Sequence, residues 1–586
     1  MTEVPLSFAQ ERLWFLNRVE GMSAANIVPV TFRLSGALNV EALEAALGDV
    51  AVRHETLRTV FPVVGGVPRQ RVLPAAQGRP TLVVAEPGEQ GLSSVVDQAA
   101  GRGFDLTVDL PFRAWLFVTG PVEQLLLLVF HHIACDGWSQ EPLWRDLALA
   151  YAARLEGGEP QWSSLPVTYA DYAVWQRTVL GDEDDPGSAM SRHLAYWREQ
   201  LAGLPEYLEL PADRPRPTLA SRRVDMLTFR VEAGLHRLLR DLAQDCGVTM
   251  FMVMHAAIAG LLTRLGAGTD IPVGSPVAGR ADDALNEVVG CFVNTLVLRA
   301  DTSGNPSFRQ LLIRIRDTDL SAYDHQDLPF EKLVHSLNPA RSLDRSPLFQ
   351  VMLAYYDGAG NDLRLTGVQA CRESVDIGGA GIFDLVFSLV DEHSAADGSG
   401  AVDCTLAYAA DLFDPETVER MARGFELLLE GVASDPDTPI GEVEIGFPTG
   451  PSRPIRPRNS VGVTAPVAPR GEARPIADQG ERTEVEKTLC GLFAEVLQRE
   501  PIEIHDDFFD LGGHSLAATR LIARVRSVLG ARLGLREFFD EPTVAGVARR
   551  LGASTQQDPL PLISRRRVEP PPRTRPAITN RSNSAI

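Results

Sequence analysis

The chain has 586 residues, a formal net charge of −21 at pH 7, 45% hydrophobic residues and 23% charged residues. This length is too great for one hydrophobic core and predicts several domains, and the acidic balance argues against a general nucleic-acid-binding protein. No apolar run approaches the roughly 20 residues that cross a bilayer, and the first residues lack the pattern of a signal peptide. The six cysteines are scattered along the chain. We therefore expect a cytoplasmic protein without membrane spans.

The first informative element is an apolar run over 125–130, which predicts a buried strand. The run continues into His131-His132-Ile133-Ala134-Cys135-Asp136-Gly137-Trp138-Ser139. Because successive strand residues face opposite sides, only one histidine can point into a given cleft, and the other turns back into the body. Asp136 and Gly137 are turn formers. Ser139 is a candidate N-cap for a helix whose apolar stripe includes Trp144 and Tyr151.

The histidine pair is interpreted as a site that handles a proton. A neutral imidazole at a strand end is suited to moving a proton near pH 7. No Cys or Glu stands at ligand spacing, so we expect no metal site.

Two lobes are predicted for the first three quarters of the chain. A charged and glycine-rich stretch over 181–187 predicts a boundary, which separates an N-terminal lobe, 1–180, from a C-terminal lobe, 181–446. The composition then changes, and 447–480 is rich in Pro, Arg, Gly and Ala, which predicts a mobile linker.

A small helical bundle is predicted over 481–553. Apolar residues recur at helical spacing over 485–497, Ser515 opens a second helix, and Thr543 is a candidate cap for a third. The polar and Pro-rich segment 554–586 is expected to be a disordered tail.

Ser515 stands in the segment Phe508-Phe509-Asp510-Leu511-Gly512-Gly513-His514-Ser515-Leu516-Ala517. The two glycines permit a tight turn. A phosphodiester on a serine at a helix start would meet the positive end of the helix dipole. Taken alone, the segment is an ordinary loop that ends in a serine N-cap, and Ser515 becomes a candidate modification site only through a family resemblance.

The segment His131–Gly137 resembles the active-site motif that is shared by nonribosomal peptide synthetase condensation domains, epimerization domains and chloramphenicol acetyltransferase-like acyltransferases. Phe508–Ala517 resembles the site of a peptidyl carrier protein whose serine, here Ser515, carries 4′-phosphopantetheine. Further segments resemble the core motifs of condensation domains in the family's order: 7–16, 53–61, 169–175, 289–295, 325–331 and 344–350.

The resemblance implies an α/β fold with two chloramphenicol-acetyltransferase-like lobes in a V, plus a small all-α carrier-protein four-helix bundle. It implies that His132 is catalytic and either accepts a proton or steers the tetrahedral intermediate. His131 would orient the loop, and Gly137 would let the backbone approach the reacting carbonyl. Asp136 would have a structural role and pair with an arginine, for which Arg280 is the candidate.

The implied reaction joins a donor thioester to an aminoacyl thioester on Ser515. No adenylation domain separates the condensation motifs from the carrier motif, so we expect a stand-alone adenylation enzyme to load Ser515. The condensation motifs begin at Pro5, so an upstream donor carrier protein is expected to act in trans. A phosphopantetheinyl transferase and a possible downstream synthetase or thioesterase are the other expected partners, and neither nucleic acid nor a membrane is expected.

Three alternatives remain open from the sequence. The early motifs resemble the subtype that joins an L-donor to an L-acceptor, and lipid-initiating condensation domains share much of that pattern. An ester-forming enzyme shares the histidine motif, and a non-catalytic recruitment platform shares the fold. The tail segment 559–567 resembles the linker between a carrier and a following condensation domain, and is either a remnant or a docking segment. His54 and His325 are expected to have structural roles.

Overall fold

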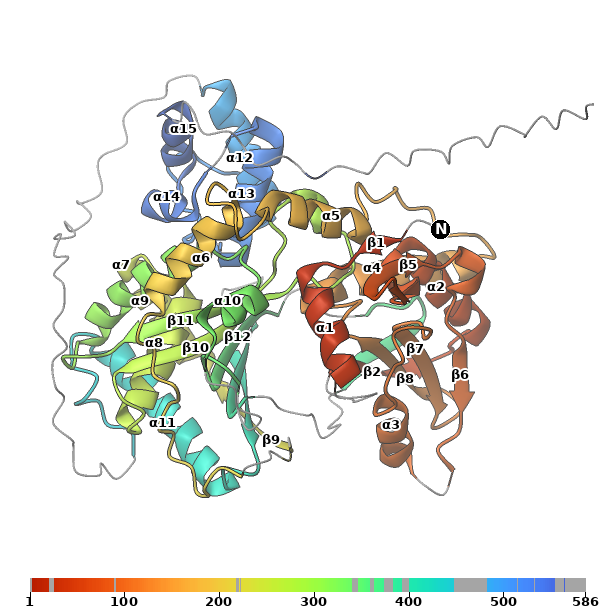
Figure 1. The fold of residues 1–586 in the computed structure, drawn as a ribbon, viewed down its shortest axis with the longest axis horizontal. Helices are drawn as coiled ribbons and strands as arrows, with labels where there is room; N and C mark the ends of the chain where they lie inside the picture. Colours follow the sequence, from red (N-terminus) through yellow and green to blue (C-terminus); the bar gives the residue numbers. More distant parts are fainter. Residues whose placement is uncertain are drawn as a thin grey trace, which may run out of the picture.

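The computed structural model describes most of the chain. The described residues are 3–19, 26–88, 91–217, 221, 223–339, 346–358, 363–373, 383–392, 400–446, 482–513, 515–531, 533–553 and 563. They form two α/β lobes, which lie side by side in Figure 1, and a helical domain at the top of that view. The expected linker, 447–480, and the expected tail, apart from Ile563, lie outside the described residues.

The N-terminal lobe contains a five-stranded sheet with the strand order β13-β2-β8-β7-β6. Its strands are β2 (Ile27–Gly36), β6 (Leu82–Ala85), β7 (Phe112–Val118), β8 (Glu123–His131) and β13 (Val368–Glu373). A small second sheet is formed by β1 (Val4–Pro5), β3 (Thr59–Val60), β4 (Val63–Val64) and β5 (Val67–Val72). The helices are α1 (Phe8–Val19), α2 (Val40–Arg53), α3 (Leu92–Ala100), α4 (Gln140–Leu155) and α5 (Tyr169–Leu180), with short 3₁₀ turns η2 (Glu55–Arg58), η3 (Ala75–Gln77) and η5 (Gly137–Ser139).

The C-terminal lobe contains a six-stranded sheet with the order β11-β10-β12-β14-β15-β9. Its strands are β9 (Val224–Val231), β10 (Asp270–Val277), β11 (Asn294–Asp301), β12 (Val351–Asp357), β14 (Leu385–Asp391) and β15 (Val402–Ala409). Its helices are α6 (Ala189–Gln200), α7 (Ala233–Cys246), α8 (Met250–Arg264), α9 (Phe308–Tyr323), α10 (Phe330–Leu337) and α11 (Pro415–Ser434), with the 3₁₀ turn η6 (Asp283–Leu285). Among the described residues no single helix is long and apolar enough to cross a bilayer, and α7 and α8 reach that length only as a pair bent by 102°.

One strand crosses from the second half of the chain into the first lobe. β13 pairs antiparallel with β2, from Val368 opposite Gly36 to Glu373 opposite Thr31. The sequence-based boundary near residue 180 assigns β13 to the C-terminal lobe. In the structure it forms one edge of the N-terminal sheet, because β2 would otherwise expose its backbone donors and acceptors.

Strand β8 explains the apolar run that the sequence analysis singled out. It lies in the middle of its sheet and pairs with β2 on one side and β7 on the other. Every residue from Gln124 to His131 is buried, and a strand covered on both faces is expected to be apolar throughout. The strand ends at His131, so the histidine loop starts from a rigid central element.

The helical domain consists of α12 (Glu484–Leu497), α13 (Ser515–Leu529), α14 (Leu535–Asp540) and α15 (Val544–Ala553). Its core contains fully buried side chains, among them Leu489, Phe493, Phe508 and Phe538. The hydroxyl of Thr543 accepts a hydrogen bond from the N–H of Gly546 at 3.0 Å, so Thr543 caps α15 as the sequence predicts. The predicted all-α bundle is confirmed.

Candidate functional site

The histidine loop lies between β8 and α4. The turn is closed by hydrogen bonds from the N–H of Ala134 to the carbonyl of His131 at 2.9 Å and from the N–H of Ser139 to the carbonyl of Asp136 at 3.2 Å. The two adjacent histidines differ in burial: His131 is buried and His132 is half-buried. The alternation expected at a strand end is therefore present.

The His131 imidazole faces the body of the lobe. Its Nδ1 accepts a hydrogen bond from the N–H of Ile133 at 3.1 Å, and its ring meets the edge of Phe104 at a centroid distance of 5.9 Å. Burial, with a smaller effect from His132, lowers the pKa of His131 to about 3. A ring nitrogen that accepts a backbone N–H needs a free lone pair, so the geometry and the pKa both require the neutral form.

The His132 imidazole lies on the other side of the loop. Its backbone N–H donates to the carbonyl of Asn26 at 2.8 Å, and its Nδ1 lies 3.7 Å from the Cys291 Sγ. Burial lowers the pKa of His132, although Asp136 acts in the opposite direction. Burial also raises the pKa of the Cys291 thiol. A neutral His132 beside a protonated thiol can accept a proton near pH 7.

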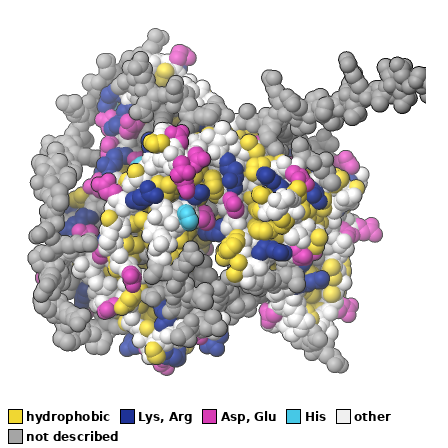
Figure 2. All heavy atoms as spheres, viewed as in Figure 1, with side chains coloured by type: hydrophobic (Ala, Val, Ile, Leu, Met, Phe, Trp, Pro, Cys, Tyr) yellow, Lys and Arg dark blue, Asp and Glu magenta, His cyan; other side chains and the backbone are white. Residues whose placement is uncertain are grey.

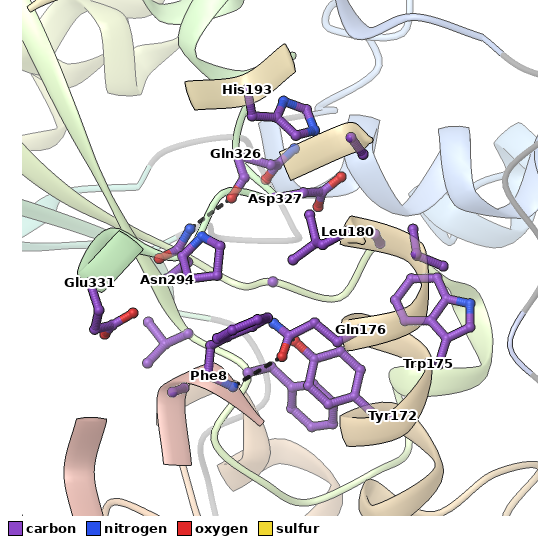
Figure 3. Close-up of a pocket in the computed structure, with 18 of the residues that line it drawn as sticks. Phe8, Tyr172, Trp175, Gln176, Leu180, His193, Asn294, Gln326, Asp327 and Glu331 are labelled. Atoms are coloured by element: carbon purple, nitrogen blue, oxygen red, sulfur yellow. Dashed lines mark hydrogen bonds between the residues drawn. The ribbon is translucent and has the colours of Figure 1, made fainter. Parts of the chain in front are cut away.

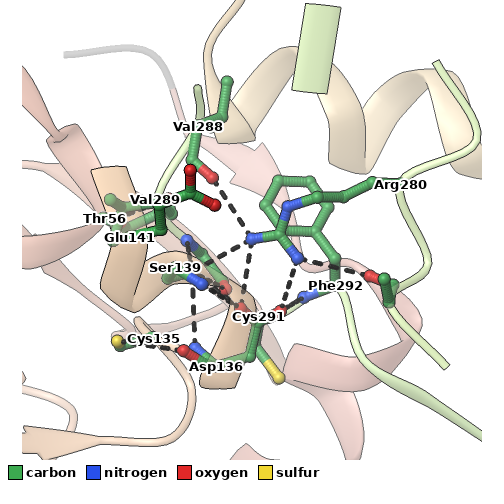
Figure 4. Close-up of polar contacts among 12 residues, drawn as sticks. Thr56, Cys135, Asp136, Ser139, Glu141, Arg280, Val288, Val289, Cys291 and Phe292 are labelled. Atoms are coloured by element: carbon green, nitrogen blue, oxygen red, sulfur yellow. Dashed lines mark hydrogen bonds and ion pairs between the residues drawn. The ribbon is translucent and has the colours of Figure 1, made fainter. Parts of the chain in front are cut away.

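The Asp136 carboxylate is buried and fully hydrogen-bonded (Figure 4). It accepts from the N–H and the hydroxyl of Ser139 at 2.9 and 2.8 Å, from the N–H of Phe292 at 2.9 Å, and from both terminal nitrogens of Arg280 at 3.1 Å. Burial alone would raise the pKa of Asp136, but the Arg280 ion pair and these hydrogen bonds hold the pKa below its usual value. The carboxylate is therefore ionised.

Arg280 connects this carboxylate to the C-terminal lobe. It follows β10, and its guanidinium also donates to the Ser139 hydroxyl at 3.1 Å and to the carbonyl of Val288 at 3.4 Å. The guanidinium carbon lies 4.3 Å from the centroid of the Phe292 ring. We call the group Asp136, Ser139, Arg280 and Phe292 the lobe clasp, because its members come from both lobes.

Sequence reasoning placed Asp136 and Arg280 but missed the other members of the clasp. Ser139 precedes α4 as expected, yet its hydroxyl does not cap that helix. It bonds Asp136, and it bridges to the carbonyl and the N–H of Gly290 at 2.9 and 3.1 Å. The sequence did offer one signal for Cys291 and Phe292, the motif over 289–295. That this motif lies beside the histidine loop follows only from the fold.

Gly137 is exposed at the start of η5. A Cβ added there would meet the ring of Tyr356 at 3.9 Å, an ordinary contact distance. Packing within the protein therefore does not require glycine at this position, and its proposed role in letting a carbonyl approach stays a prediction.

His54 and His325, which the sequence analysis expected to be structural, both lie outside the loop. The His54 Nε2 is 2.9 Å from Asp146, with both side chains buried. The His325 Nδ1 is 2.9 Å from the His193 Nδ1, beside a pocket between the lobes that Phe8, Tyr172, Asn294 and Glu331 help to line (Figure 3). Within the described part of the chain no cluster of three or more His, Cys, Asp or Glu side chains could hold a metal ion.

Ser515 is the first residue of α13, as the sequence predicts. Before it, Gly512 has a φ of +97°, and a Cβ added to Gly513 would lie 2.2 Å from the ring of Phe508. The two glycines thus let the turn close against the core of the bundle and deliver Ser515 to the helix start. A helix N-terminus with this close turn fits a covalently attached phosphodiester.

The lowered pKa of His131 predicts a pH effect on stability. The folded pKa of about 3 lies below the unfolded value of about 6.5. Neutral His131 therefore makes its full contribution to the unfolding free energy above pH 6.5, and this contribution is lost as the pH falls toward 3. His131→Asn keeps an acceptor for the Ile133 N–H but does not titrate. We expect the loss of unfolding free energy between pH 7.5 and pH 5 to shrink by about 2 kcal/mol in this variant.

The measurement is urea unfolding followed by tryptophan fluorescence. All seven tryptophans lie between Trp14 and Trp197, so the signal reports on the lobes and not on the helical bundle. An unchanged pH dependence in His131→Asn would contradict the neutral, buried assignment.

The clasp predicts a large cost for removing its carboxylate. Asp136→Ala leaves the buried Arg280 without its counter-charge, and we expect a loss of roughly 3–5 kcal/mol of unfolding free energy. The matched control is Arg423→Ala, which removes an exposed ion pair with Glu426 and should cost less than about 1 kcal/mol. Fluorescence-detected unfolding compares the two, and an Asp136→Ala variant that unfolds like the control would show that the clasp adds no stability.

Two family models match the chain. Residues 1–448 match the condensation domain, and residues 487–551 match the phosphopantetheine attachment site. The two matches follow one another and cover both lobes and the helical bundle.

Similar proteins come from peptide synthetases. The chain is 54% identical over 442 residues to CymA of Salinispora arenicola, which is described as a probable non-canonical nonribosomal peptide synthetase, and the match covers 75% of this chain and 6% of the relative. It is 48% identical over 466 residues to a dimodular nonribosomal peptide synthase of Bacillus subtilis, covering 80% of this chain and 20% of the relative. The chain thus spans only a small part of the relatives it matches.

Solved structures show the same fold. The X-domain from teicoplanin biosynthesis has a TM-score of 0.70 and 36% identity, over 76% of this chain and 98% of that domain. The four-domain nonribosomal peptide synthetase AB3403 has a TM-score of 0.66 at 22% identity, over 76% of this chain and 34% of that protein, a likeness of fold alone. Since the condensation model covers both lobes and the attachment-site model covers the bundle, the chain belongs to the condensation-domain family and carries a phosphopantetheine attachment domain after it.

Proposed function

We propose that this protein forms an amide bond between a donor thioester, brought in trans by a separate carrier protein, and an aminoacyl thioester on its own carrier domain. The observation that supports the proposal is the His132 loop, complete and joined to both lobes by Asp136 and Arg280, in one chain with Ser515 at the start of α13.

The proposed step needs positioning more than a strong base. The acceptor nitrogen attacks the donor carbonyl, the C–N bond forms, the C–S bond breaks, and the donor thiol leaves. An α-amino group has a pKa near 8, so a fraction is neutral at pH 7. His132 takes the proton that the nitrogen loses and returns it to the leaving thiolate, or it stabilises the intermediate. General-base help of this kind typically contributes about 10²–10⁴-fold.

Ser515 is the proposed attachment point of 4′-phosphopantetheine. The group supplies a flexible arm and the thiol on which an aminoacyl thioester is carried. The turn at Gly512 and Gly513 places the serine at the helix start. A phosphopantetheinyl transferase is the enzyme that would install the arm.

We also propose that a separate adenylation enzyme loads Ser515. The condensation match ends at residue 448 and the attachment-site match begins at residue 487. The segment between them is far shorter than a typical folded domain of 100 or so residues. A downstream synthetase or thioesterase would receive the product. The six cysteines are all free, which supports the proposal that the protein works in the cytoplasm.

A second candidate function is recruitment of a partner enzyme. The teicoplanin X-domain, 36% identical with a TM-score of 0.69, has been solved in a complex with OxyB. That observation favours a platform function for this fold, in which the histidine loop would have no chemical role. The reconstitution below separates the two functions.

The first experiment for the proposed function is a reconstitution followed by intact-mass measurement. We expect Ser515 to gain one phosphopantetheine, then an aminoacyl group only when a separate adenylation enzyme, ATP and its amino acid are added, and then a product when a loaded donor carrier is added. Ser515→Ala should prevent every gain. His132→Ala should keep both loading steps and lower condensation by roughly 10²–10⁴-fold.

The His132→Ala result discriminates between catalysis and recruitment. If wild type and His132→Ala formed equal amounts of product, His132 would have no role in the condensation reaction. Loading without any product would favour the recruitment platform.

The second experiment tests the proposal that the linker over 447–480 is a mobile tether between the condensation and carrier domains. A coil of about 35 residues spans roughly 30–35 Å root-mean-square and holds its carrier at roughly millimolar effective concentration. We expect a separate carrier, residues 479–555, to support condensation by residues 1–447 only with weak apparent affinity. Titrating the excised carrier measures this directly, and saturation below micromolar carrier would contradict a mobile tether.

A further inference from the structure

The carrier domain contacts the condensation domain through pairs of oppositely charged side chains. Arg520 and Arg524 of α13 lie 3.3 Å from Glu141 and 2.9 Å from Asp283. In α14, Arg536 lies 3.6 Å from Asp317, and Asp540 lies 2.9 Å from Arg316 of α9. Figure 2 shows basic and acidic side chains next to one another in the upper part of the molecule, where Figure 1 places the carrier.

The order of these contacts orients α13. Along the helix, Ser515 comes first, then Arg520 beside Glu141, then Arg524 beside Asp283, and then Arg526 at the edge of the pocket between the lobes. With a rise of 1.5 Å per residue, Ser515 lies about 7–8 Å along the axis from Arg520. Glu141 belongs to the first turn of α4, the helix that follows the histidine loop. The face that α13 contacts therefore includes the helix directly after the loop that carries His132.

A residue beyond the carrier is also seated on the condensation domain. Ile563 is 8% exposed, and its N–H donates to the Asp282 carboxylate at 3.3 Å. Its side chain belongs to an apolar cluster formed by Val167, Tyr169, Tyr172, Leu285, Val288 and Phe292.

The Ile563 cluster adjoins the lobe clasp. Phe292 donates its N–H to Asp136 and lies under Arg280, and the carbonyl of Val288 accepts from Arg280. The Tyr169 hydroxyl donates to the carbonyl of Cys291, the neighbour of His132. Ile563 therefore packs against residues that support the histidine loop from behind.

We infer that the face formed by the start of α4, η6 and α9 is a docking site for the chain's own carrier, with Ile563 as a second anchor after α15. The inference rests on the proposed function, because the docked carrier is taken to present the arm on Ser515 to His132. Ile563 holds the chain on the condensation domain beyond the carrier.

The physics of the contacts predicts a reversible docked state. The charge pairs are partly exposed, and each such pair contributes little and is screened by salt. Burial of the Ile563 side chain contributes without screening. The docked carrier can therefore leave for a loading enzyme and return.

The docking is tested by cross-linking in the full chain. With the exposed Cys371 replaced by serine, Glu141→Cys and Arg520→Cys are joined by a short bis-maleimide. We expect an intramolecular cross-link whose yield falls about tenfold when Ile563→Asp is added. The matched control, Val528→Asp, places the same charge at an exposed apolar position of α13 and should leave the yield unchanged. A second control, Glu141→Cys with Arg549→Cys, should not cross-link.

The condensation rate of the loaded full chain tests whether the docked state supports the reaction. We expect Ile563→Asp and Arg520→Glu to lower the rate about tenfold, with Ser515 loading intact, and Glu141→Arg to restore the Arg520→Glu variant. Rates equal to or above wild type would overturn a productive docked state. A cross-link yield that is unchanged by Ile563→Asp would overturn docking within the chain. A cross-linked species of twice the chain mass would do the same, because it would join two molecules. The cross-link needs no condensation, so it remains informative if wild type forms no product.

Discussion

A buried carboxylate that must be neutralised is the constraint on which this structure depends. Asp136 sits in the loop after β8, and its counter-charge, Arg280, comes from the other lobe. An ionised carboxylate cannot remain in the protein interior without a partner and hydrogen bonds. The loop can therefore reach its folded geometry only when the C-terminal lobe supplies Arg280 and the N–H of Phe292. Folding of the site and assembly of the two lobes become one event.

The same arrangement separates the tasks of two adjacent histidines. His131 is fixed in the neutral form by a backbone donor and an apolar surrounding. His132 is left half-buried, with Cys291 from the opposite lobe beside its Nδ1. One imidazole is thus part of the scaffold, and the other is the one to which we assign the proposed chemistry. The alternation of a strand end is enough to produce this difference.

Local features were predictable from the sequence because they depend on neighbours in the chain. The apolar run that became β8, the start of α13 at Ser515 and the Thr543 cap all follow from periodicity and capping rules. Asp136 and Arg280 were paired through resemblance to a family and not through spacing. The crossing of β13, the contacts of Ser139 with Gly290 and Arg280, and the packing of Ile563 could not be predicted, because each joins residues far apart in the chain. A hydroxyl before a helix looks like a cap, and only the tertiary fold shows that it also bonds Gly290 and Arg280.

The crossing strand has a mechanical consequence. β13 fixes the second half of the chain to the edge of the first sheet, and the clasp fixes the lobes to each other at the histidine loop. A partly exposed ion pair between Arg12 of α1 and Glu331 of α10 adds a further contact between the lobes, but a pair of this kind contributes little. While β13 and the clasp hold, the lobes can rotate about the line that joins them, but they cannot slide or come apart. Any widening between the lobes would then be a hinge motion whose pivot includes the residues around His132, so the spacing around His132 would change less than the spacing between parts of the lobes far from it.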